Sequence, residues 1–565
     1  MQERLIEEFA PIFVPDDYSE KDRQHLAPFF TNLDKSVYVP LIVAPELIGA
    51  LCSRTSRASQ DLRHIYLHEF VYPFVEPVRE EKDTDTDWEE KTKYGASLKK
   101  FIEFLHEHPM LDLFSNPRAR SFYTKWLAQY GDDSIAQMAG AHLVFGNLSQ
   151  VAIKHFEDQR IGLAPIEKST RYVNYSQRVA GNYLYYTDPT LRDFGLYDEY
   201  RRVMDGLSDT YARLIPAMIS WLTERFPEEK PSVIEKKAFD TLRGLLPTST
   251  LSQVAFFGNG QAFEYLVSRS AKHRLGEIRW ASAQAHEELM KVIPSFLRRL
   301  ESDASKEYQE YLAGKDERLE PVVTKLYEGR HAPLEKNGGV RLLEYDAEGE
   351  DKVVSGILFS APGSHESFEK ILKIVRGMKP EEKKEVLEKY LAGRNARWQK
   401  IGRPFENVYL RFEILMNIGA WRDLHRHRML TQQRQYFSCY HGYDIPQEVT
   451  EAGLESEFSQ AIKPVEDLFV KIAGKNPLLA QYCVTMAHRL RFKQWENLRQ
   501  SFWQIELRSI PEGHPDYRKI VQKKFRLIEK VYPLIAGYML VNLGEYDFAR
   551  RGQEERIQRK MQQLS

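Results

Sequence analysis

The sequence predicts an α+β fold that is predominantly helical and built from two tandem copies of one domain. Apolar residues recur at helical spacing in several long segments, whereas stretches with strand character are few. The order of these features also repeats, with a period of roughly 240–270 residues. So long a period is typical of a duplicated domain and not of a solenoid, whose units are much shorter.

In the first half, the best strand-like stretch is 37–43, and Pro40 inside it indicates an edge strand or a break. The stretch 76–93 is rich in charge and weakly patterned, so we expect a solvated loop or insertion there. Apolar residues at helical spacing over 144–155 predict a helix, and those over 263–289 predict one face of a long helical region.

In the second half, the charged stretch 300–351 contains a breaker at Gly338 and is expected to link the two halves. The stretch 352–359 has strand character. We expect an apolar helix over 412–421, ahead of the most basic segment, and helical spacing returns over 498–508.

Composition limits the classes of function. The chain of 565 residues is 42% apolar and 28% charged, which is ordinary for a soluble globular protein. Lys and Arg number 80 against 81 Asp and Glu, so the chain lacks the basic excess of a dedicated nucleic-acid or anionic-membrane binder. Three cysteines cannot form a disulfide framework, and the N-terminus lacks the pattern of a signal peptide. We therefore expect a cytoplasmic protein with no nucleic-acid or membrane partner.

The densest polar segment contains Arg426, His427 and Arg428, directly after the apolar stretch 412–421. Guanidinium groups at the end of a buried element suit phosphates and electron-rich carbonyls. The alternative is a basic helix C-terminus that complements the helix dipole. A metal site at His425 and His427 lacks another His or carboxylate pair at a supporting spacing, so we expect no metal.

A second polar segment runs from Glu167 to Arg171. The hydroxyls of Ser169 and Thr170 beside Arg171 form a compact set of donors suited to a phosphate, and the alternative is an exposed turn. An arginine on the inner face of a helix is costly unless it meets an anion, a polar ligand or a structural ion-pair partner. Arginines of this kind are Arg243, Arg269, Arg499 and Arg508.

Taken in order, these segments make the chain resemble a tandem duplication of the flavin-dependent thymidylate synthase domain. The Arg-His-Arg string of that family stands here as Arg426-His427-Arg428, and its Glu-x-Ser-x-Arg-Tyr string spans Glu167 to Tyr172. An Arg-x-x-Leu-Pro string spans Arg243 to Pro247, and an Asn-x-Arg string spans Asn497 to Arg499. Each string is short, and their order over both halves makes the match specific.

The family strings are divided between the two halves. Where the family has Arg-His-Arg, the first half has Gln159-Arg160-Ile161. Where the family has Glu, Ser and Arg, the second half has Arg434, Tyr436 and Ser438. The second half also replaces Arg243 by Gln481, while the first half replaces Glu406 and Arg499 by Gln137 and Gln261. The resemblance thus implies an active site shared between the two copies or between chains.

The resemblance also implies an architecture, in which each copy is a small antiparallel sheet packed with long helices. We expect the first copy at 1–300 with an insertion near 70–118, a charged linker at 301–338, and the second copy at 339–565. Since family members are homotetramers with sites at subunit interfaces, we expect a homodimer that forms a pseudo-tetramer.

The implied activity is the methylation of dUMP to dTMP, with FAD as cofactor, methylenetetrahydrofolate as carbon donor and NADPH as reductant. The residues implied to bind dUMP are Glu167, Ser169, Thr170, Arg171, Arg243, Arg269 and Arg426. The catalytic role falls to Arg269, which would polarise the uracil. The residues implied to bind FAD are Arg426, His427, Arg428, Glu406, Asn497, Arg499 and, more weakly, Asn259. Arg508 would match Arg269 in the other copy, and the sequence leaves open whether Arg508 and Asn259 are vestigial.

Two other functions stay open at this point. A duplicated chain that has lost string residues can keep the fold and a ligand without the chemistry, as a degenerate nucleotide- or flavin-binding paralogue. The Arg/His segment could instead serve a nucleic-acid-binding scaffold, which the balanced net charge disfavours.

Overall fold

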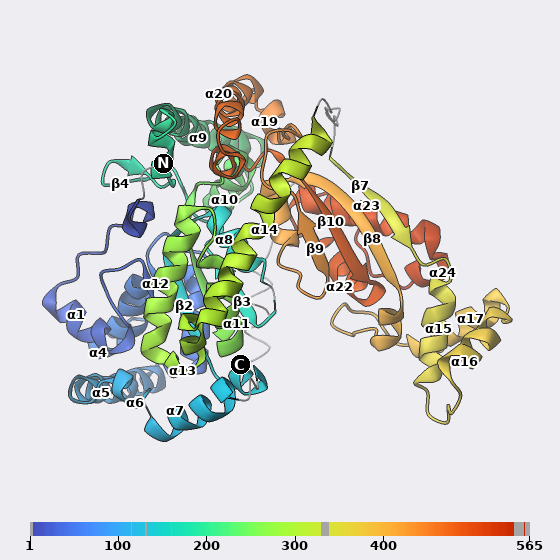
Figure 1. Ribbon diagram of the computed structural model, residues 1–565, viewed down its shortest axis with the longest axis horizontal. Helices are drawn as coiled ribbons and strands as arrows, with labels where there is room; N and C mark the ends of the chain where they lie inside the picture. The colour runs from blue at the N-terminus through green and yellow to red at the C-terminus, as the bar shows by residue number, and fades with distance from the viewer. Residues whose placement is uncertain are drawn as a thin grey trace. The chain divides into compact units, whose positions relative to one another are not determined.

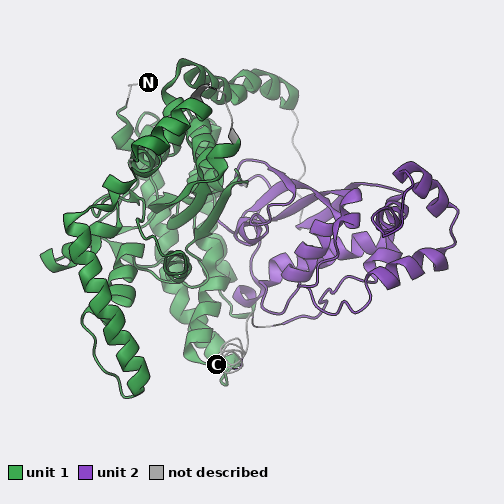
Figure 2. Ribbon diagram, turned by 90° about the horizontal axis from the view of Figure 1, so that it is seen from below, with its two compact units in different colours: residues 1–332, 451–484 green, residues 333–450, 485–565 purple. Residues whose placement is uncertain are grey.

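Figure 1 shows the computed structural model of the chain. Two units divide the chain (Figure 2). Unit 1 comprises 1–332 and 451–484, and unit 2 comprises 333–450 and 485–565. A segment of the second half, 451–484, therefore belongs to the unit that the first half builds. The structure describes residues 4–114, 116–129, 133–159, 161–328, 338–546, 548 and 559.

Unit 1 is organised around a four-stranded antiparallel sheet with the strand order β1-β2-β6-β3. Its long central strands pair over most of their length, with Phe145 opposite Val254. Residues on both faces of β2 are buried, including Leu143, Val144 and Phe145, so the strand lies inside the core. The strands are β1 (Val37–Tyr38), β2 (Gly140–Ser149), β3 (Leu163–Glu167) and β6 (Leu251–Asn259), and a separate hairpin joins β4 (Arg178–Val179) to β5 (Asn182–Tyr183).

Helices surround this sheet, and the second half of the chain supplies two of them. Helices from the first half are α1 (Glu20–Leu26), α2 (Pro45–Thr55), α3 (Leu62–Ile65), α4 (Tyr72–Val75), α5 (Asp85–Glu107), α6 (Met110–Leu113), α7 (Pro117–Tyr123), α8 (Gln150–Glu157), α9 (Tyr197–Arg225), α10 (Pro231–Leu242), α11 (Gly260–Ser270), α12 (Gly276–Val292), α13 (Pro294–Leu297) and α14 (Asp303–Tyr327). Those from the second half are α20 (Glu455–Ala473) and α21 (Pro477–Ala480). Unit 1 also has the short 3-10 helices η5 (Asp133–Gln137), η7 (Arg243–Leu245) and η10 (Gln481–Cys483).

Unit 2 repeats the plan with a sheet in the order β7-β8-β10-β9. Its strands are β7 (Gly339–Tyr345), β8 (Tyr409–Asn417), β9 (Thr431–Arg434) and β10 (Arg489–Asn497). Its helices are α15 (Gly349–Phe359), α16 (Phe368–Arg376), α17 (Pro380–Tyr390), α18 (Ile418–Leu424), α19 (Gln447–Glu451), α22 (Leu498–Arg508), α23 (Pro515–Val531), α24 (Pro533–Ala536) and the 3-10 helix η9 (Arg403–Asn407).

The two copies share their local helix starts as well as their sheet order. A central strand ends at Ser149 in one copy and at Asn417 in the other, and each side chain accepts a hydrogen bond from the first turn of the next helix. Asn259 and Asn497 end the other central strands and cap α11 and α22 in the same way. The predicted fold class is confirmed, since the chain is mostly helical and carries two small antiparallel sheets of one topology.

Several local predictions need correction. The apolar stretches 144–155 and 412–421 were expected to be helical throughout, but each begins as a strand, β2 or β8, and turns into a helix only after its capping residue. Adjacent positions on both faces of these strands are buried, and a mostly apolar stretch of this length does not distinguish strand from helix. The stretch 352–359, expected as a strand, lies in α15, where Val353, Val354 and Ile357 share the buried face.

Other predictions hold in part. Strand β1 covers only Val37–Tyr38, and Pro40 makes an isolated antiparallel bridge to Phe30, in agreement with a broken edge strand. The charged stretch 76–93 is a loop only up to Thr84, which caps α5. The helical region 263–289 is interrupted between α11 and α12, and much of the charged stretch 300–351 is the helix α14. Helix α22 occupies 498–508 as predicted.

The segment 451–484 is bound to unit 1 by backbone and side-chain contacts. The backbone N–H of Thr248 donates to the carbonyl of Val484 over 2.8 Å, and the hydroxyl of Tyr482 donates to the carboxylate of Glu277 over 2.8 Å. Glu277 also accepts hydrogen bonds from the backbone and hydroxyl of Ser149. Burial raises the pKa of Glu277 to about 7.

Candidate functional site

Glu167 lies at the end of β3, in a buried ion pair. One carboxylate oxygen accepts a hydrogen bond from Gln150 over 2.7 Å, and the other accepts one from Lys154 over 2.8 Å. Lys154 also donates to Glu157 over 2.6 Å, and its side chain has no exposed surface. Glu167 stays a predicted dUMP contact, and in the structure its carboxylate is held by two side chains of α8.

The next residues of this segment are anchored to the loop that follows α2. The backbone N–H of Lys168 donates to the carbonyl of Gln253 on β6, and that of Ser169 donates to the carbonyl of Ser56. The ammonium group of Lys168 donates to two further loop carbonyls, at 2.7 and 2.8 Å. Burial lowers the pKa of Lys168 to about 8. The backbone from Glu167 to Arg171 is therefore fixed from both sides, which suits a site that must hold its donors in place.

Arg171 and Arg243, far apart in the sequence, share the carboxylate of Asp240. Arg171 lies 3.0 Å from one carboxylate oxygen of Asp240, and Arg243 lies 3.3 Å from the other. All three residues are buried, as is the neighbouring Thr170. Two guanidinium groups against one carboxylate leave a net positive charge on this triad. One terminal nitrogen of Arg243 is buried without a hydrogen-bond partner among the described residues, so the triad has a donor available for an anion.

Arg269, on α11, contacts α8. Its guanidinium donates to the backbone carbonyl of His155, and the imidazole of His155 lies 2.9 Å from the hydroxyl of Ser270. The ring of His155 also packs edge-on against His273, with centroids 4.6 Å apart. Burial, aided by the charges of Arg269 and Arg279, lowers the pKa of His273 to about 4. Since His155 follows Lys154, α8 connects the surroundings of Glu167 to those of Arg269.

In unit 2, the Arg-His-Arg segment follows α18 and contacts α22. Arg426 and Arg428 are exposed, whereas His427 between them is buried. Arg508 donates from its Nε to Nε2 of His427 over 2.9 Å, and Gln500 lies 3.2 Å from Nδ1. The donation from Arg508 requires Nε2 of His427 to be unprotonated. Arg508, which the sequence left open as functional or vestigial, thus contacts the ring of His427.

The other predicted flavin residues lie at the N-terminal end of α22. Asn497 caps the helix by accepting a hydrogen bond from the backbone of Gln500 over 2.9 Å. Arg499, in the first turn, forms an ion pair with Glu406 of η9. The structure therefore brings Glu406, Asn497, Arg499 and His427 together around one helix. An 11-residue helix whose N-terminal turn carries an arginine is suited to bind a phosphate group.

The first copy has a neutral version of this arrangement. Asn259 caps α11 through the backbone N–H of Ala262 over 2.8 Å. Gln137 donates to the side-chain oxygen of Gln261 over 2.9 Å, at the positions of Glu406 and Arg499. Of the string Gln159-Arg160-Ile161, Arg160 lies outside the described residues. The charges expected for an anionic cofactor are present in the second copy and replaced by amides in the first.

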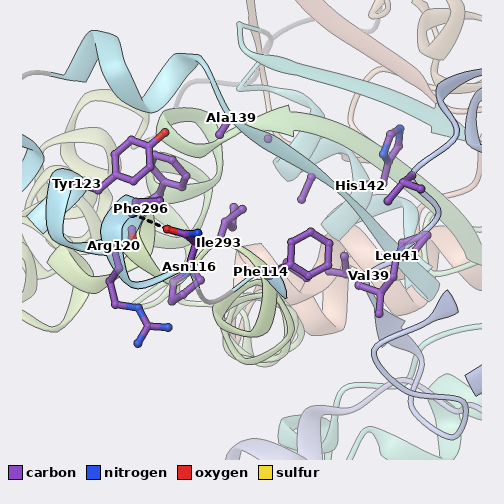
Figure 3. Close-up of a pocket in the computed structure, with 18 of the residues that line it drawn as sticks. Val39, Leu41, Phe114, Asn116, Arg120, Tyr123, Ala139, His142, Ile293 and Phe296 are labelled. Atoms are coloured by element: carbon purple, nitrogen blue, oxygen red, sulfur yellow. Dashed lines mark hydrogen bonds between the residues drawn. The ribbon is translucent and has the colours of Figure 1, made fainter. Parts of the chain in front are cut away.

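Unit 1 also contains a cavity of about 370 Å³ (Figure 3). It lies between the segment 39–43 after β1, the start of β2, α7 and α13, and its lining is mostly apolar. Tyr123 and Phe296 pack together at one end, with ring centroids 4.7 Å apart, and His142 lies at the other end. None of the predicted site residues lines this cavity.

Sequence reasoning missed three residues that organise the predicted ones. Asp240 joins the two nucleotide-assigned arginines, Lys154 binds Glu167, and His155 contacts Arg269. A signal existed for Asp240, because it precedes Arg243 by three residues on one helical face. Among the described residues, no group of three or more His, Cys, Asp or Glu side chains could hold a metal ion. In the same part of the chain, no helix is long and apolar enough to cross a membrane.

Comparison with known proteins gives three findings. The chain matches the family model described as thymidylate synthase complementing protein over residues 78–295 and 341–534. It is 35% identical over 552 residues to a UPF0159 protein of Chlamydia muridarum, covering 96% of this chain and 98% of that protein. It is also 30% identical to the UPF0159 protein Ta1429 of Thermoplasma acidophilum, covering 78% and 92% of the two chains.

Among solved structures, the chain is similar to one titled as a UMP/dUMP methylase, PolB, from Streptomyces cacaoi bound with 5-Br dUMP. The identity is 15%, the match covers 36% of this chain and 96% of the other, and the TM-score is 0.30. A likeness this distant does not bear on the function of the chain.

Proposed function

The chain belongs to the thymidylate synthase complementing protein family, and we propose on this basis that it methylates dUMP to dTMP. In this proposal methylenetetrahydrofolate donates the carbon, NADPH is the reductant and FAD is the cofactor. In the same proposal, unit 1 provides the nucleotide contacts and unit 2 provides the flavin contacts.

The triad of Arg171, Asp240 and Arg243 is the observation that carries the proposal. A nucleoside monophosphate brings a dianionic phosphate, and the triad offers two guanidinium groups beside the carboxylate of Asp240. The buried terminal nitrogen of Arg243, which has no hydrogen-bond partner in the described part of the chain, would gain one on binding. Ser169 and Thr170 belong to the same anchored segment and would add hydroxyl donors.

The donors around α22 fit the pyrophosphate of FAD. The helix N-terminus, Arg499 and the exposed Arg426 and Arg428 supply positive charge, and the buried His427 orients the segment between those two arginines. When bound, the reduced flavin supplies hydride to the reaction. Arg426 would also approach dUMP, and Asn259 is the weaker candidate from the first copy.

The cysteines support a route without a protein nucleophile. All three are buried. Burial raises the pKa of Cys52 to about 12 and also raises that of Cys483, so their thiolate forms are suppressed. The task left to the protein is to bind, orient and polarise the uracil, and we assign the polarising role to Arg269, whose guanidinium is held by α8.

We propose further that the copies are bounded at 1–300 and 339–565, with 301–338 between them, and that two chains form a homodimer with the site shared between copies. Light scattering coupled to size exclusion tests the assembly. A strictly monomeric chain would contradict a site that is shared between chains.

The activity is tested by tritium release from dUMP labelled at the methylation carbon, with methylenetetrahydrofolate, NADPH and FAD present. We expect release by the wild type, and at least a tenfold rise in the KM for dUMP in Arg243→Gln, because about 1.4 kcal/mol of phosphate binding is a factor of ten. Arg178→Gln is the matched control, since Arg178 is an exposed arginine of the same unit. A folded, flavin-containing protein that releases no tritium would instead be the non-catalytic paralogue.

A further inference from the structure

Two large aromatic rings stand exposed, side by side, on the central strands of the unit 2 sheet. Tyr409 begins β8 and Trp495 lies near the end of β10, with ring centroids 5.4 Å apart and an interplanar angle of 53°. Tyr409 is 49% exposed and Trp495 is 45% exposed. The neighbours of these two residues along their strands, Leu410 and Glu496, are buried on the opposite face. The pair therefore forms a ring-lined patch on the outer face of the sheet.

Two basic side chains lie beside the rings, and one of them, Arg411, is also 3.3 Å from the carboxylate of Glu344. Arg411 stands directly opposite Trp495 in the strand register, and its guanidinium lies 5.2 Å from the centroid of that ring. Lys493 precedes Trp495 by two residues and is exposed on the same face. Rings flanked by cations are the pattern that binds flat heteroaromatic groups carrying phosphate.

The patch is continuous with the residues already assigned to the cofactor. Asn497 follows Trp495 by two residues and lies opposite Tyr409 in the register. Asn497 caps α22, and the first turn of α22 carries Arg499 in its ion pair with Glu406. A dinucleotide bound at this helix N-terminus has the rings within reach along the same face of the sheet.

We propose that Tyr409 and Trp495 form a stacking platform for a planar ring of the flavin dinucleotide, with Arg411 and Lys493 facing its phosphates. This proposal rests on the proposed function, from which it takes the identity of the ligand. An indole is electron-rich and the oxidised isoalloxazine is electron-poor, so their offset stacking is favourable. The adenine ring offers the same flat surface, and titration with FMN and with ADP distinguishes the two rings.

The first copy has the same strand positions without the platform. Phe257 is the register partner of His142, as Trp495 is of Arg411, and the two rings lie 4.8 Å apart. Gly140 stands opposite Asn259, where the second copy has Tyr409 opposite Asn497. Burial lowers the pKa of His142, so this side chain is neutral near pH 7. The first copy thus lacks the counterparts of the Tyr409 ring and of the Arg411 cation. Phe257 is therefore a matched control for Trp495.

The test measures flavin binding directly. Full-length wild type, Trp495→Leu, Trp495→Phe, Tyr409→Leu and Phe257→Leu are stripped of flavin and titrated with FAD by equilibrium dialysis and by flavin fluorescence. We expect Trp495→Leu and Tyr409→Leu to weaken FAD binding about tenfold or more, and Phe257→Leu to bind as the wild type does. Trp495→Phe should retain most of the affinity. Thermal unfolding checks that each variant is folded.

Parallel titrations with FMN and ADP identify the ring. If the isoalloxazine stacks on Trp495, FMN loses affinity in Trp495→Leu and bound flavin is strongly quenched in the wild type but brighter in both Trp495 variants. If the adenine stacks, ADP loses affinity instead and the emission of the isoalloxazine changes little. Either pattern supports the platform. A wild type that binds FAD with the same affinity as a folded Trp495→Leu overturns the platform and leaves the proposed function standing. A wild type that binds no flavin overturns both.

Discussion

The side-chain amide of Gln137 donates a hydrogen bond to the side-chain oxygen of Gln261 over 2.9 Å. The equivalent positions in the second copy hold the ion pair of Glu406 and Arg499. Both copies thus keep a contact between a short 3-10 helix and a later helix, η5 with α11 in the first copy and η9 with α22 in the second, with amides in the first where the second has charges. A neutral pair can hold the helix in position but adds no cation for a phosphate.

The double variant Glu406→Gln/Arg499→Gln should give the second copy the neutral amide pair that the first copy has at these positions. Because the pair is more than a third exposed, we expect a loss of at most about 1 kcal/mol in unfolding free energy. FAD affinity should fall about tenfold or more, because a charged hydrogen bond to phosphate is lost. Urea unfolding and equilibrium dialysis measure the two effects. Gln261→Ala in the first copy is the control, and equal loss of FAD from both proteins would contradict the assignment.

Replacing Asp240 by Asn should destabilise unit 1 and make its stability depend on anions. The substitution leaves Arg171 and Arg243 buried without their shared carboxylate, which costs about 3 kcal/mol or more. A bound phosphate or dUMP would then restore part of the lost charge balance. We expect dUMP to raise the melting temperature of Asp240→Asn by more than that of the wild type. An equal or smaller rise would show that removing the carboxylate of Asp240 does not strengthen anion binding beside these arginines.

His273 should make unit 1 less stable in mild acid. Its pKa is lowered from 6.5 to about 4, so the unfolded chain takes up a proton at a higher pH than the folded one. The stability is present above pH 6.5 and is lost as the pH falls through 4, by up to about 3 kcal/mol. His273→Asn can keep the hydrogen bond that His273 accepts from the backbone of Leu275. Its unfolding free energy should be flatter than that of the wild type over this range.

Glu277 should make unit 1 less stable as the pH rises, which is opposite to the effect of His273. Its pKa is raised from 4.5 to about 7, so the folded state holds a proton that the unfolded chain has already lost. The stability from this group is present below pH 4.5 and declines as the pH rises through 7. Glu277→Gln imitates the protonated form, so its stability relative to the wild type should increase between pH 5 and pH 8. A constant difference over that range would show that Glu277 is ionised throughout.

Arg508 should influence the flavin only through His427. Replacing Arg508 by Leu removes the hydrogen bond to Nε2 of the histidine and leaves Arg426 and Arg428 in place. We expect weaker FAD binding in Arg508→Leu and in His427→Ala, and little further loss in the double variant, as found for residues that act together. Additive losses would indicate that Arg508 binds the ligand by itself, and unchanged binding in Arg508→Leu would support the vestigial interpretation.

The repeat, the helical character and most of the polar clusters could be predicted from the sequence because they depend on local order. The residues of Glu167–Arg171 are consecutive in the sequence, as are those of Arg426–Arg428, so they remain neighbours in the fold. The switch from strand to helix at Ser149 and Asn417 could not be read from apolar periodicity, because both elements are buried there. A polar cap inside an apolar run was the available signal.

Contacts between distant segments were beyond prediction. Asp240 meets Arg171 only because α10 lies beside the segment after β3, and Arg508 reaches His427 only because α22 packs beside the end of α18. Pairings of this kind depend on tertiary packing, which one sequence without its relatives does not encode in a readable pattern. Tyr409 and Trp495 are far apart in the sequence and are neighbours only because β8 pairs with β10 in this register.

Because 451–484 belongs to unit 1, unit 1 cannot complete its fold during synthesis until this segment has been made. At a synthesis rate of about 5–20 residues per second, the ribosome needs roughly ten to thirty seconds to travel from the end of the first half to Val484. During that time Glu277 has no Tyr482 to donate to it, and Thr248 has no backbone partner at Val484. Unit 1 therefore lacks the segment 451–484 until the ribosome has also made 333–450, which is most of unit 2. The unit that begins first in the sequence is completed only after that point.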